Sequence, residues 1–368
     1  MVLPIQPRVS DHMDQIKDMI TQIINNDCAY TIDGDVYFAV DKSPNYGRLS
    51  GRKLENNRAG ERVAVDSRKR NPADFALWKA AKPGEPSWDS PWGPGRPGWH
   101  IECTCQESIV SYWMHNGHVT NNNEKMSKSL GNFFTIRQIT DLYHPLALRY
   151  FLLGTHYRSP VNYSIAQLEI ASEAVFYIYQ TLRDCEDTLS LFQEVNGRNV
   201  CITPAAQDCI RTLQTDFQTK MSDDLSTPHI LNASLQEALR FINSCLNMLK
   251  KKQQKQQQLS AVESLTELGK EVKGVLSVLG LLSTLAYSEV LQQLKGKALK
   301  RAGMIEDDVL HLIEERALAR KNKDFSKGDQ IRADLASKGI ALMDVGKETI
   351  WRPCVPVQQE PQAPASST

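Results

Sequence analysis

The chain has 368 residues and a mass of 41.4 kDa, and its 43 Lys+Arg are balanced by 43 Asp+Glu. At about 100 to 200 residues per domain, this length predicts two or three domains. A composition of 41% hydrophobic and 23% charged residues is typical of a globular protein and excludes a disordered or fibrous one. Zero net charge excludes a globally basic nucleic-acid binder, although local basic patches are allowed.

Features of export or membrane insertion are not expected. The longest apolar stretch, residues 275–287, is interrupted by Gly280 and Ser283 and is shorter than the roughly 18 residues of a membrane span. The first residues match neither a signal peptide nor a transit peptide, which predicts a cytoplasmic protein. Of eight cysteines only Cys103 and Cys105 are close in sequence, so reduced thiols are expected rather than disulfides.

The N-terminal region, residues 1–160, is expected to be mixed α and β. Ser10 is a suitable cap for a helix that ends near residue 25. Apolar residues follow this cap at helical spacing: Met13, Ile16, Ile20 and Ile23. A hairpin is predicted over residues 29–32 and 36–40, turning at Asp33-Gly34, and then an irregular insertion over residues 42–98 with short elements such as residues 74–81.

From residue 133 the pattern becomes helical. Two capping boxes are predicted, Thr135 with Gln138 and Ser164 with Gln167. Pro145 suits a first helical turn, and Gly154 is expected to end that helix in the left-handed conformation. Four amphipathic segments with apolar residues at spacings of three and four predict an antiparallel helical bundle over residues 161–300.

A small α/β appendage is predicted over residues 301–354. It would contain helices over residues 307–321 and 325–338, Gly339 after the second helix, and strands over residues 340–343 and 349–351. The tail, residues 355–368, has no hydrophobic periodicity and is expected to be disordered.

The most specific motif is Lys125-Met126-Ser127-Lys128-Ser129, followed by Leu130-Gly131-Asn132. Two ammonium groups, two hydroxyls and a glycine can clamp the β and γ phosphates of ATP and neutralise the charge that builds as pyrophosphate leaves. The alternative is a solvated basic loop. The attached Gly131-Asn132-Phe133 favours the functional interpretation, because the whole segment is the KMSKS signature of class I aminoacyl-tRNA synthetases.

Further segments closely resemble cysteinyl-tRNA synthetases, and their sequences are most similar to those of plant cytosolic forms. These segments are residues 70–79, 85–88, 92–103, 112–117, 156–160, 223–228 and 339–351. The resemblance implies a partial Rossmann-like class I catalytic domain, then an anticodon-binding type of antiparallel helical bundle and a small C-terminal α/β domain. It implies that ATP and cysteine form cysteinyl-adenylate, from which cysteine passes to its tRNA, without a membrane or DNA partner.

The resemblance also implies site residues. Lys125 and Lys128 would be catalytic, and the ATP site would include Met126, Ser127 and Ser129 as well. Trp99 would line the cysteine pocket, for which the alternative is an ordinary core aromatic residue. Cys103 would be one of four zinc ligands, for which the alternative is a buried thiol; zinc suits the thiolate of a cysteine substrate and discriminates against serine.

The sequence departs from the family pattern in two places. By comparison with the family, the chain is expected to begin after the HIGH motif and a first zinc-ligand Cys, and a His-His-Glu-Asn-Glu segment with further zinc ligands is expected to be missing after Cys103. His115-Asn116-Gly117-His118 has the form of HIGH but is interpreted as a strand and turn leading to the KMSKS motif. The alternative function is therefore a catalytically inactive tRNA-binding remnant, from a splice variant or an incomplete gene model. A ligase joining cysteine to an amino sugar is disfavoured by the bundle and appendage.

Several basic residues are candidates for tRNA contact, although solvated faces are the alternative for each: Arg48, Arg52, Lys53, Arg58, Arg62, Arg68, Lys69, Arg70, Arg316, Arg320, Lys321 and Lys323. Arg316, Arg320 and Lys323 are expected to share one helical face. Asp223-Asp224 is interpreted as structural, with Thr227 as a helix cap and the acids favouring the helix dipole.

Overall fold

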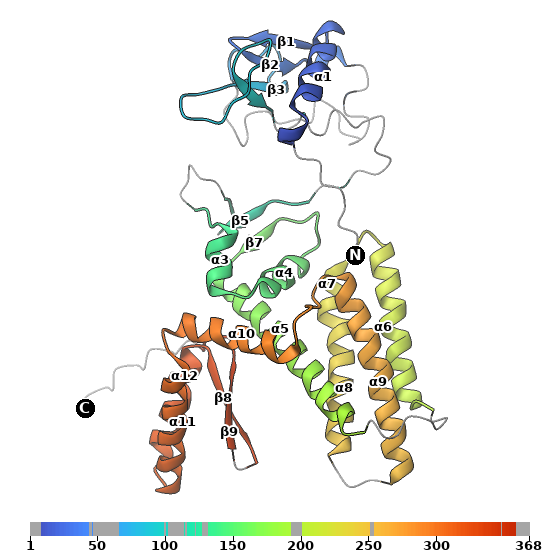
Figure 1. Ribbon diagram of the computed structural model, residues 1–368, viewed down its shortest axis with the longest axis vertical. Helices are drawn as coiled ribbons and strands as arrows, with labels where there is room; N and C mark the ends of the chain where they lie inside the picture. Colours follow the sequence, from blue (N-terminus) through green and yellow to red (C-terminus); the bar gives the residue numbers. More distant parts are fainter. Residues whose placement is uncertain are drawn as a thin grey trace, which may run out of the picture. The chain divides into compact units, whose positions relative to one another are not determined.

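The computed structural model describes residues 9–43, 46, 66–98, 101, 114, 116–121, 123–126, 132–192, 201–250, 254–346 and 348–357. The chain divides into two compact units, Met1–Met114 and His115–Thr368 (Figure 1). Among the helices of these described ranges, none is both long and apolar enough to cross a membrane.

The first unit is a helix on an antiparallel sheet of order β1-β2-β3-β4. Its elements are α1 (Met13–Asn25), β1 (Ala29–Ile32), β2 (Asp35–Phe38), β3 (Phe75–Ala80) and β4 (Gly95–Pro97). The predicted hairpin is confirmed, and its turn residues Asp33 and Gly34 have positive φ angles of 49° and 83°. The short element predicted over residues 74–81 is β3, and the rest of the region predicted to be irregular also supplies β4, which completes the sheet.

The apolar stripe of α1 forms the core of this unit. Ile16 and Ile20 are buried together with Val36, Leu77 and Trp78 from the sheet. The predicted helix start at Ser10 is wrong, because the residues Val9–Asp11 form a separate 3-10 turn. His12 occupies the N-cap without a side-chain cap hydrogen bond.

The second unit begins with a three-stranded sheet of order β6-β5-β7. Its first elements are β5 (Val119–Asn121), β6 (Glu124–Lys125), α3 (Ile136–Leu142), α4 (Pro145–Leu153) and β7 (Val161–Tyr163). Strands β5 and β7 are parallel and are connected through α3 and α4, a crossover of the kind that parallel strands require. Gly154 ends α4, but its φ of −70° is right-handed, so the predicted left-handed cap is wrong.

The capping box predicted at the start of α3 is confirmed, whereas at the start of α5 only the Ser164 half of the predicted box is present. The Thr135 side chain accepts a hydrogen bond from the Gln138 N–H, and the Gln138 side chain accepts one from the Thr135 N–H. At the start of α5 the hydroxyl of Ser164 accepts from the Gln167 N–H. Local side-chain chemistry therefore fixes where both helices begin.

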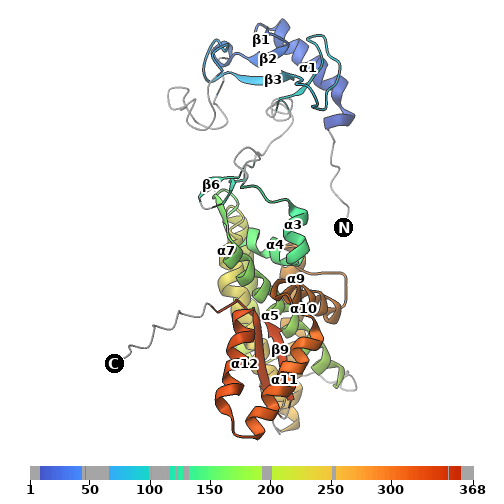
Figure 2. The same ribbon diagram turned by 90° about the vertical axis from the view of Figure 1, so that its left-hand side faces the viewer.

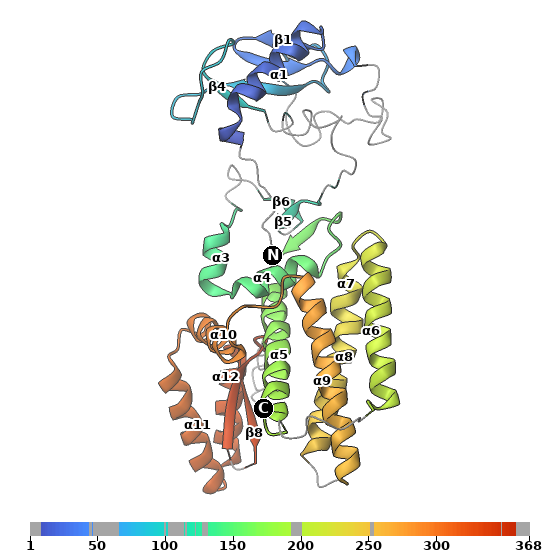
Figure 3. The same cartoon turned by 45° about the vertical axis from the view of Figure 1, so that its right-hand side comes forward.

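The predicted bundle is confirmed by four helices that run alternately up and down (Figure 3). They are α5 (Ile165–Ser190), α6 (Pro204–Ser222), α8 (Leu235–Leu249) and α9 (Lys255–Val278), with the short α7 (Thr227–His229) and a π-helical segment (Ile230–Ser234) between α6 and α8. Their apolar stripes meet in one core, in which Leu168, Leu182, Leu239 and Leu268 are almost fully buried. Burial of these stripes is the main source of the bundle's stability.

The appendage follows one helix that the sequence interpretation missed, α10 (Tyr287–Ala302). It comprises α11 (Glu306–Lys321), α12 (Phe325–Ser337), β8 (Ile340–Val345) and β9 (Glu348–Pro353), and Figure 2 shows the two helices beside the hairpin. Gly339 follows α12 with a φ of 83°, as predicted. Leu335, Ile340 and Trp351 are buried in its separate core. The predicted disorder is wrong for residues 355–357, because the Val357 N–H donates to the Ala336 carbonyl of α12 at 3.1 Å, and residues 358–368 lie outside the described residues.

Candidate functional site

The KMSKS motif begins at the end of a short hairpin in the second unit. Lys125 is the last residue of β6, and its backbone pairs with Thr120 of β5. Met126 is partly buried against the core of the bundle. The Lys125 side chain and all of Ser127, Lys128 and Ser129 lie outside the described residues. The structure therefore describes the two elements that flank the motif, the β5–β6 hairpin and α3.

Asn162 of β7 holds this hairpin by its side chain. Its Oδ1 accepts hydrogen bonds from the N–H of Asn123, at 3.0 Å, and from the Thr120 hydroxyl, at 3.3 Å. Asn123 has a positive φ of 65° at the turn, a conformation that Asn tolerates better than most residues. Asn162 therefore fixes the approach to Lys125. Sequence reasoning missed it, although Asn is uncommon in strands.

Gly117 allows the chain before β5 to lie against the chain before β7. Its N–H donates to the carbonyl of Tyr157 at 2.7 Å, and a Cβ at this position would lie 2.1 Å from the carbonyl oxygen of Ser159. The His118 carbonyl accepts from the Val161 N–H at 2.9 Å. The interpretation of residues 115–118 as a strand approach rather than an ATP motif agrees with these contacts; His115 itself lies outside the described residues.

Replacing Gly117 with alanine is expected to lower the free energy of unfolding by about 1–3 kcal/mol, because backbone atoms would have to move apart. The control is Gly296→Ala in α10, where an added Cβ meets no atom within 4 Å. That variant is expected to gain about 0.5–1 kcal/mol from helix propensity. Urea unfolding followed by circular dichroism measures both, and equal stability of the two variants would contradict the close approach.

Asp224 links the bundle to the turn before β7. The Tyr157 hydroxyl donates to Asp224 Oδ1 at 2.6 Å, Arg158 Nη2 lies 3.1 Å from the same oxygen, and His156 Nε2 lies 3.0 Å from the Asp224 carbonyl. These contacts give Asp224 a structural role, in agreement with its structural interpretation from sequence. The predicted cap at Thr227 is wrong, because Ser226 occupies the N-cap and the Thr227 hydroxyl donates to the Leu153 carbonyl at 2.8 Å.

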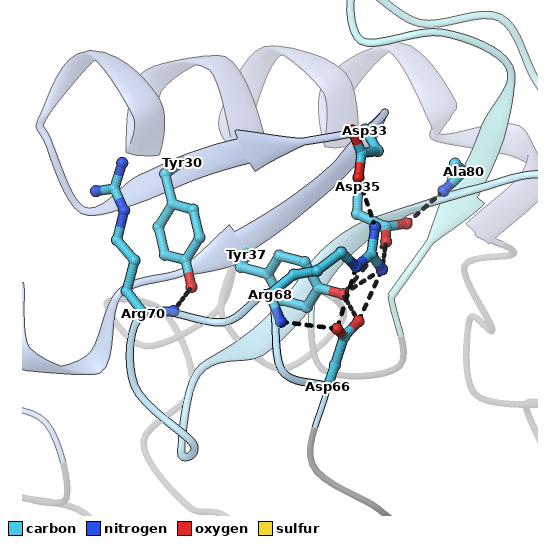
Figure 4. Close-up of polar contacts among 8 residues, drawn as sticks. All are labelled: Tyr30, Asp33, Asp35, Tyr37, Asp66, Arg68, Arg70 and Ala80. Carbon is cyan, nitrogen blue, oxygen red and sulfur yellow. Dashed lines mark hydrogen bonds and ion pairs between the residues drawn. The ribbon is translucent and has the colours of Figure 1, made fainter.

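Arg68, a candidate for tRNA contact, is surrounded by carboxylates in the first unit (Figure 4). Its Nη2 lies 2.7 Å from oxygens of both Asp35 and Asp66, and its Nη1 lies 3.3 Å from Asp33. The Tyr37 hydroxyl also donates to Asp66, at 3.0 Å. The guanidinium holds the pKa of Asp66 well below its usual range. The charge of Arg68 is therefore neutralised within the unit.

The two basic residues after Arg68 lie over aromatic rings. The Arg70 guanidinium carbon is 4.1 Å from the centroid of Tyr30, and Lys69 Nζ is 5.8 Å from that of Tyr37. Burial raises the pKa of Tyr30 to about 12, with a further contribution from its hydrogen bond to Asp74. Both cations therefore make cation–π contacts with tyrosine rings of the same unit. The candidates Arg48, Arg52, Lys53, Arg58 and Arg62 lie outside the described residues.

The basic face predicted on α11 is corrected by the structure. Arg316 is buried and makes two hydrogen bonds to the Asp344 carboxylate, at 2.9 and 3.0 Å, and Arg320 lies 2.9 Å from the same group. The hydrogen bond from Arg316 holds the pKa of Asp344 well below its usual range. Lys323 lies beyond the end of the helix with a positive φ of 61°. Arg316 is thus structural, while Lys321 and Lys323 are exposed.

The described residues supply no metal site: within them, no three or more His, Cys, Asp or Glu side chains are grouped to hold an ion. Cys103, the predicted zinc ligand, Cys105 and Trp99 lie outside these residues. Burial in the bundle raises the pKa of the Cys185 and Cys209 thiols to about 11, so both are protonated at neutral pH. Neither thiol is therefore in the thiolate form that binds a metal.

Comparisons with known proteins agree with the resemblance. The family model of the class I (C) tRNA synthetase catalytic domain matches residues 2–109 and 104–173, and that of the cysteinyl-tRNA ligase anticodon-binding domain matches residues 304–352. These matches confirm the predicted fold class.

Three relatives illustrate the similarity. Cysteine–tRNA ligase 2, cytoplasmic, of Arabidopsis thaliana is 55% identical over 393 positions, covering 96% of this chain and 77% of the relative. The CPS1 homolog of Oryza sativa subsp. japonica, a chloroplastic/mitochondrial cysteine–tRNA ligase, is 53% identical, covering 97% and 67%. A cysteine–tRNA ligase of Pelobacter propionicus is 40% identical, covering 94% and 77%.

The comparisons also bear on the stretch expected to be missing after Cys103. The catalytic-domain match consists of two segments that meet at residues 104–109. The two plant alignments span 391 and 393 positions, more than the 368 residues of this chain, so those relatives contain residues that have no counterpart within it.

Proposed function

Because the chain belongs to the cysteine–tRNA ligases, a family of class I aminoacyl-tRNA synthetases, we propose that it catalyses the ATP-dependent attachment of cysteine to tRNA. In this reaction the cysteine carboxylate attacks the α-phosphate of ATP, which releases pyrophosphate. A ribose hydroxyl at the end of the tRNA then attacks the adenylate carbonyl and releases AMP. The observation that carries the proposal is the 55% identity to a cysteine–tRNA ligase over 96% of the chain. The comparisons do not favour an inactive tRNA-binding remnant.

Lys125 and Lys128 are proposed to bind the β and γ phosphates and to stabilise the leaving pyrophosphate. Ser127 and Ser129 would donate hydrogen bonds to the same phosphates, and Met126 would anchor the segment, since it packs against the bundle core. Charge-assisted contacts of this kind accelerate the reaction when they strengthen in the transition state. Strand β6, which pairs with β5, precedes the motif, and the capped helix α3 follows it. Both elements support a defined position for the two ends of the KMSKS motif.

Trp99 and Cys103 are proposed to take part in binding the cysteine substrate. Trp99 would line the amino-acid pocket, and Cys103 would contribute a thiolate to a zinc ion. A structural or catalytic zinc site uses three or four protein ligands, and the part of the chain that the structure describes, which does not include Cys103, contains no group of three or more such side chains. No step of the proposed reaction is therefore derived through zinc.

The tRNA is proposed to lie against the C-terminal region, which matches the anticodon-binding domain. Replacing Lys321 and Lys323 together with alanine is expected to weaken tRNA binding and to reduce the slope of log K against log salt by about 0.9 per lost phosphate contact. Filter binding between about 50 and 200 mM salt measures this slope.

The matched variant is Arg320→Ala, because Asp344 already neutralises part of the charge of Arg320. A smaller change in slope is expected from it than from the loss of one exposed lysine. A double Lys321/Lys323 variant with an unchanged slope would assign those two side chains to a solvated surface.

A cytoplasmic location is part of the proposal, supported by the cytoplasmic Arabidopsis thaliana relative, although relatives of similar identity are named chloroplastic/mitochondrial. A fluorescent protein fused to the C-terminus of the chain is expected to remain in the cytosol. Import of the fusion into plastids or mitochondria would contradict this assignment.

The function itself is tested by incubating the purified chain with labelled cysteine, ATP and tRNA. Acid-precipitable cysteinyl-tRNA is expected, and its formation should require both ATP and a tRNA that carries the cysteine anticodon. Labelling that persists without ATP, or no labelling at all, would contradict the proposal.

A further inference from the structure

Helix α3, which follows the KMSKS motif, has little apolar attachment of its own. It has seven residues, and none of them is buried; Ile139 is partly buried against the bundle core, and Ile136 is 73% exposed. Its last turn contains no basic residue. The carbonyl groups at its C-terminus have no partner within the helix and carry the negative end of the helix dipole.

Two cations of α10 supply these partners. Lys297 Nζ donates to the carbonyls of Thr140 and Asp141 at 2.7 and 3.0 Å, although it lies 157 residues beyond Thr140 in sequence. Arg301 Nη1 donates to the carbonyl of Leu142 at 2.9 Å. Three consecutive carbonyls thus accept charge-assisted hydrogen bonds, which are stronger than neutral ones. We call Lys297 and Arg301 the α3 clamp.

Arg301 is held in place by its own partners. Its Nε and Nη2 lie 2.9 and 3.0 Å from the two oxygens of Glu169, and the two side chains are only 11% and 7% exposed. The Tyr143 hydroxyl donates to Glu169 at 2.8 Å, and the Arg301 guanidinium lies 4.5 Å from the centre of the Tyr143 ring. These contacts with Glu169 and Tyr143 fix the orientation of the guanidinium that donates to α3.

Helix α10 is itself fixed by two cores. Val290, Leu291 and Leu294 are buried in the core of the bundle, whereas Leu299 packs against the core of the appendage. Lys295 Nζ lies 4.6 Å from the centre of the Trp351 ring of β9. The α3 clamp therefore projects from a rigid part of the molecule.

We propose that Lys297 and Arg301 are positioning residues of the ligase, which hold α3 by its C-terminal carbonyls and thereby fix the end of the KMSKS motif that leads into this helix. The inference rests on the proposed function, because it assigns these cations a role in placing the phosphate-binding lysines. The reaction is sensitive to such placement, since a shift of about 1 Å can reduce a rate about 100-fold.

The test compares three variants of the full chain. Lys297→Met removes the ammonium group but keeps an unbranched apolar stem, and Lys297→Arg keeps a cation that can reach the carbonyls. Lys300→Met is the control, because Lys300 of the same helix pairs with the exposed side chain of Asp141 in α3, a surface ion pair that contributes little to stability. Amide hydrogen exchange of the peptide containing α3 and the kcat and KM of cysteine-dependent ATP–pyrophosphate exchange are measured for each.

Lys297→Met is expected to speed hydrogen exchange in α3 and to lower kcat about 10-fold, with the KM for cysteine and the melting temperature of the bundle unchanged. Lys297→Arg should keep both the hydrogen exchange of α3 and kcat close to their parental values, and Lys300→Met should alter neither of them. A purely structural cation would change stability without this division between kcat and KM.

Unchanged hydrogen exchange in Lys297→Met would overturn the inference, as would faster exchange accompanied by an unchanged kcat. If the parent chain shows no ATP–pyrophosphate exchange, the proposed function fails instead. In that case hydrogen exchange alone decides whether the α3 clamp exists, since it needs no catalysis: faster exchange supports the clamp and unchanged exchange refutes it.

Discussion

Replacing Lys128 with alanine is expected to lower kcat for cysteinyl-adenylate formation by about 100-fold or more, the range observed when one transition-state charge partner is removed. The reason is that negative charge grows on the β and γ phosphates as pyrophosphate leaves, so the ammonium group stabilises the transition state more than bound ATP. The KM for cysteine should not change, because Lys128 is proposed to contact only ATP. Initial rates of ATP–pyrophosphate exchange at varied ATP and cysteine measure both quantities.

Two controls make this result specific. Lys128→Arg keeps a cation near the phosphates and is expected to retain more activity than the alanine variant, although its geometry differs. Lys321→Ala is expected to leave exchange unchanged, because the exchange reaction involves no tRNA. A Lys128→Ala protein that is folded and exchanges pyrophosphate at the parental rate would remove Lys128 from the mechanism.

The second large effect is expected in the appendage, where Asp344→Ala should lower the free energy of unfolding by about 2 kcal/mol. Removing one partner of a buried pair costs about 3–5 kcal/mol, but Asp344 is 45% exposed, so water can replace part of its contact with Arg316. Arg320→Ala is the matched control, because it breaks an exposed pair with the same carboxylate and should cost no more than about 1 kcal/mol. Thermal unfolding of both variants measures the difference.

The same pair gives a pH dependence of defined sign. Arg316 lowers the pKa of Asp344 in the folded state, so the carboxylate contributes stability above its unfolded pKa of about 4, and this contribution is lost as the pH falls through the lower folded value. The stability difference between the parent and Asp344→Ala should therefore be full at pH 7 and shrink below about pH 4. A stability difference that stays constant as the pH falls below about 4 would contradict the ion pair.

Local features of the fold could be predicted from sequence because their causes lie within a few residues. The Asp33-Gly34 turn, the Thr135 and Ser164 caps and the apolar stripes of the bundle each depend on neighbouring side chains. Helix α10 was missed, although Val290, Leu291 and Leu294 have helical spacing, because its polar residues obscure a narrow apolar stripe. The short element expected over residues 74–81 is strand β3, whereas β4 was not expected in a region rich in Pro and Gly, where sheet pairing overrides local propensity.

The roles of charged residues were much less predictable than the helices. Arg316 and Arg320 have the spacing of an exposed basic face, and only the fold brings Asp344 of the hairpin against them. Lys297 and Arg301 likewise meet α3 from a distant part of the chain. Pairing of this kind depends on tertiary structure. Sequence periodicity therefore cannot distinguish a basic side chain that is free to bind phosphate from one that already pairs with a carboxylate or with the carbonyl groups of a helix C-terminus.

The chemistry of the candidate site could be read from the KMSKS motif itself, because two ammonium groups and two hydroxyls at that spacing suit a polyphosphate. The residues that position the motif could not. Gly117 and Asn162 act through a few contacts with segments about 40 residues away in sequence, and glycine and asparagine are also common in ordinary turns. Only the folded chain shows how these two residues hold the hairpin before Lys125.

The central claim, that this chain is a cysteine–tRNA ligase, is tested most directly by amino-acid-dependent exchange of labelled pyrophosphate into ATP. The purified chain is assayed with cysteine, with serine and without an amino acid, at equal protein and ATP concentrations. The expected result is exchange that requires cysteine and is not supported by serine. No exchange above background with cysteine, or equal exchange with both amino acids, would contradict the claim.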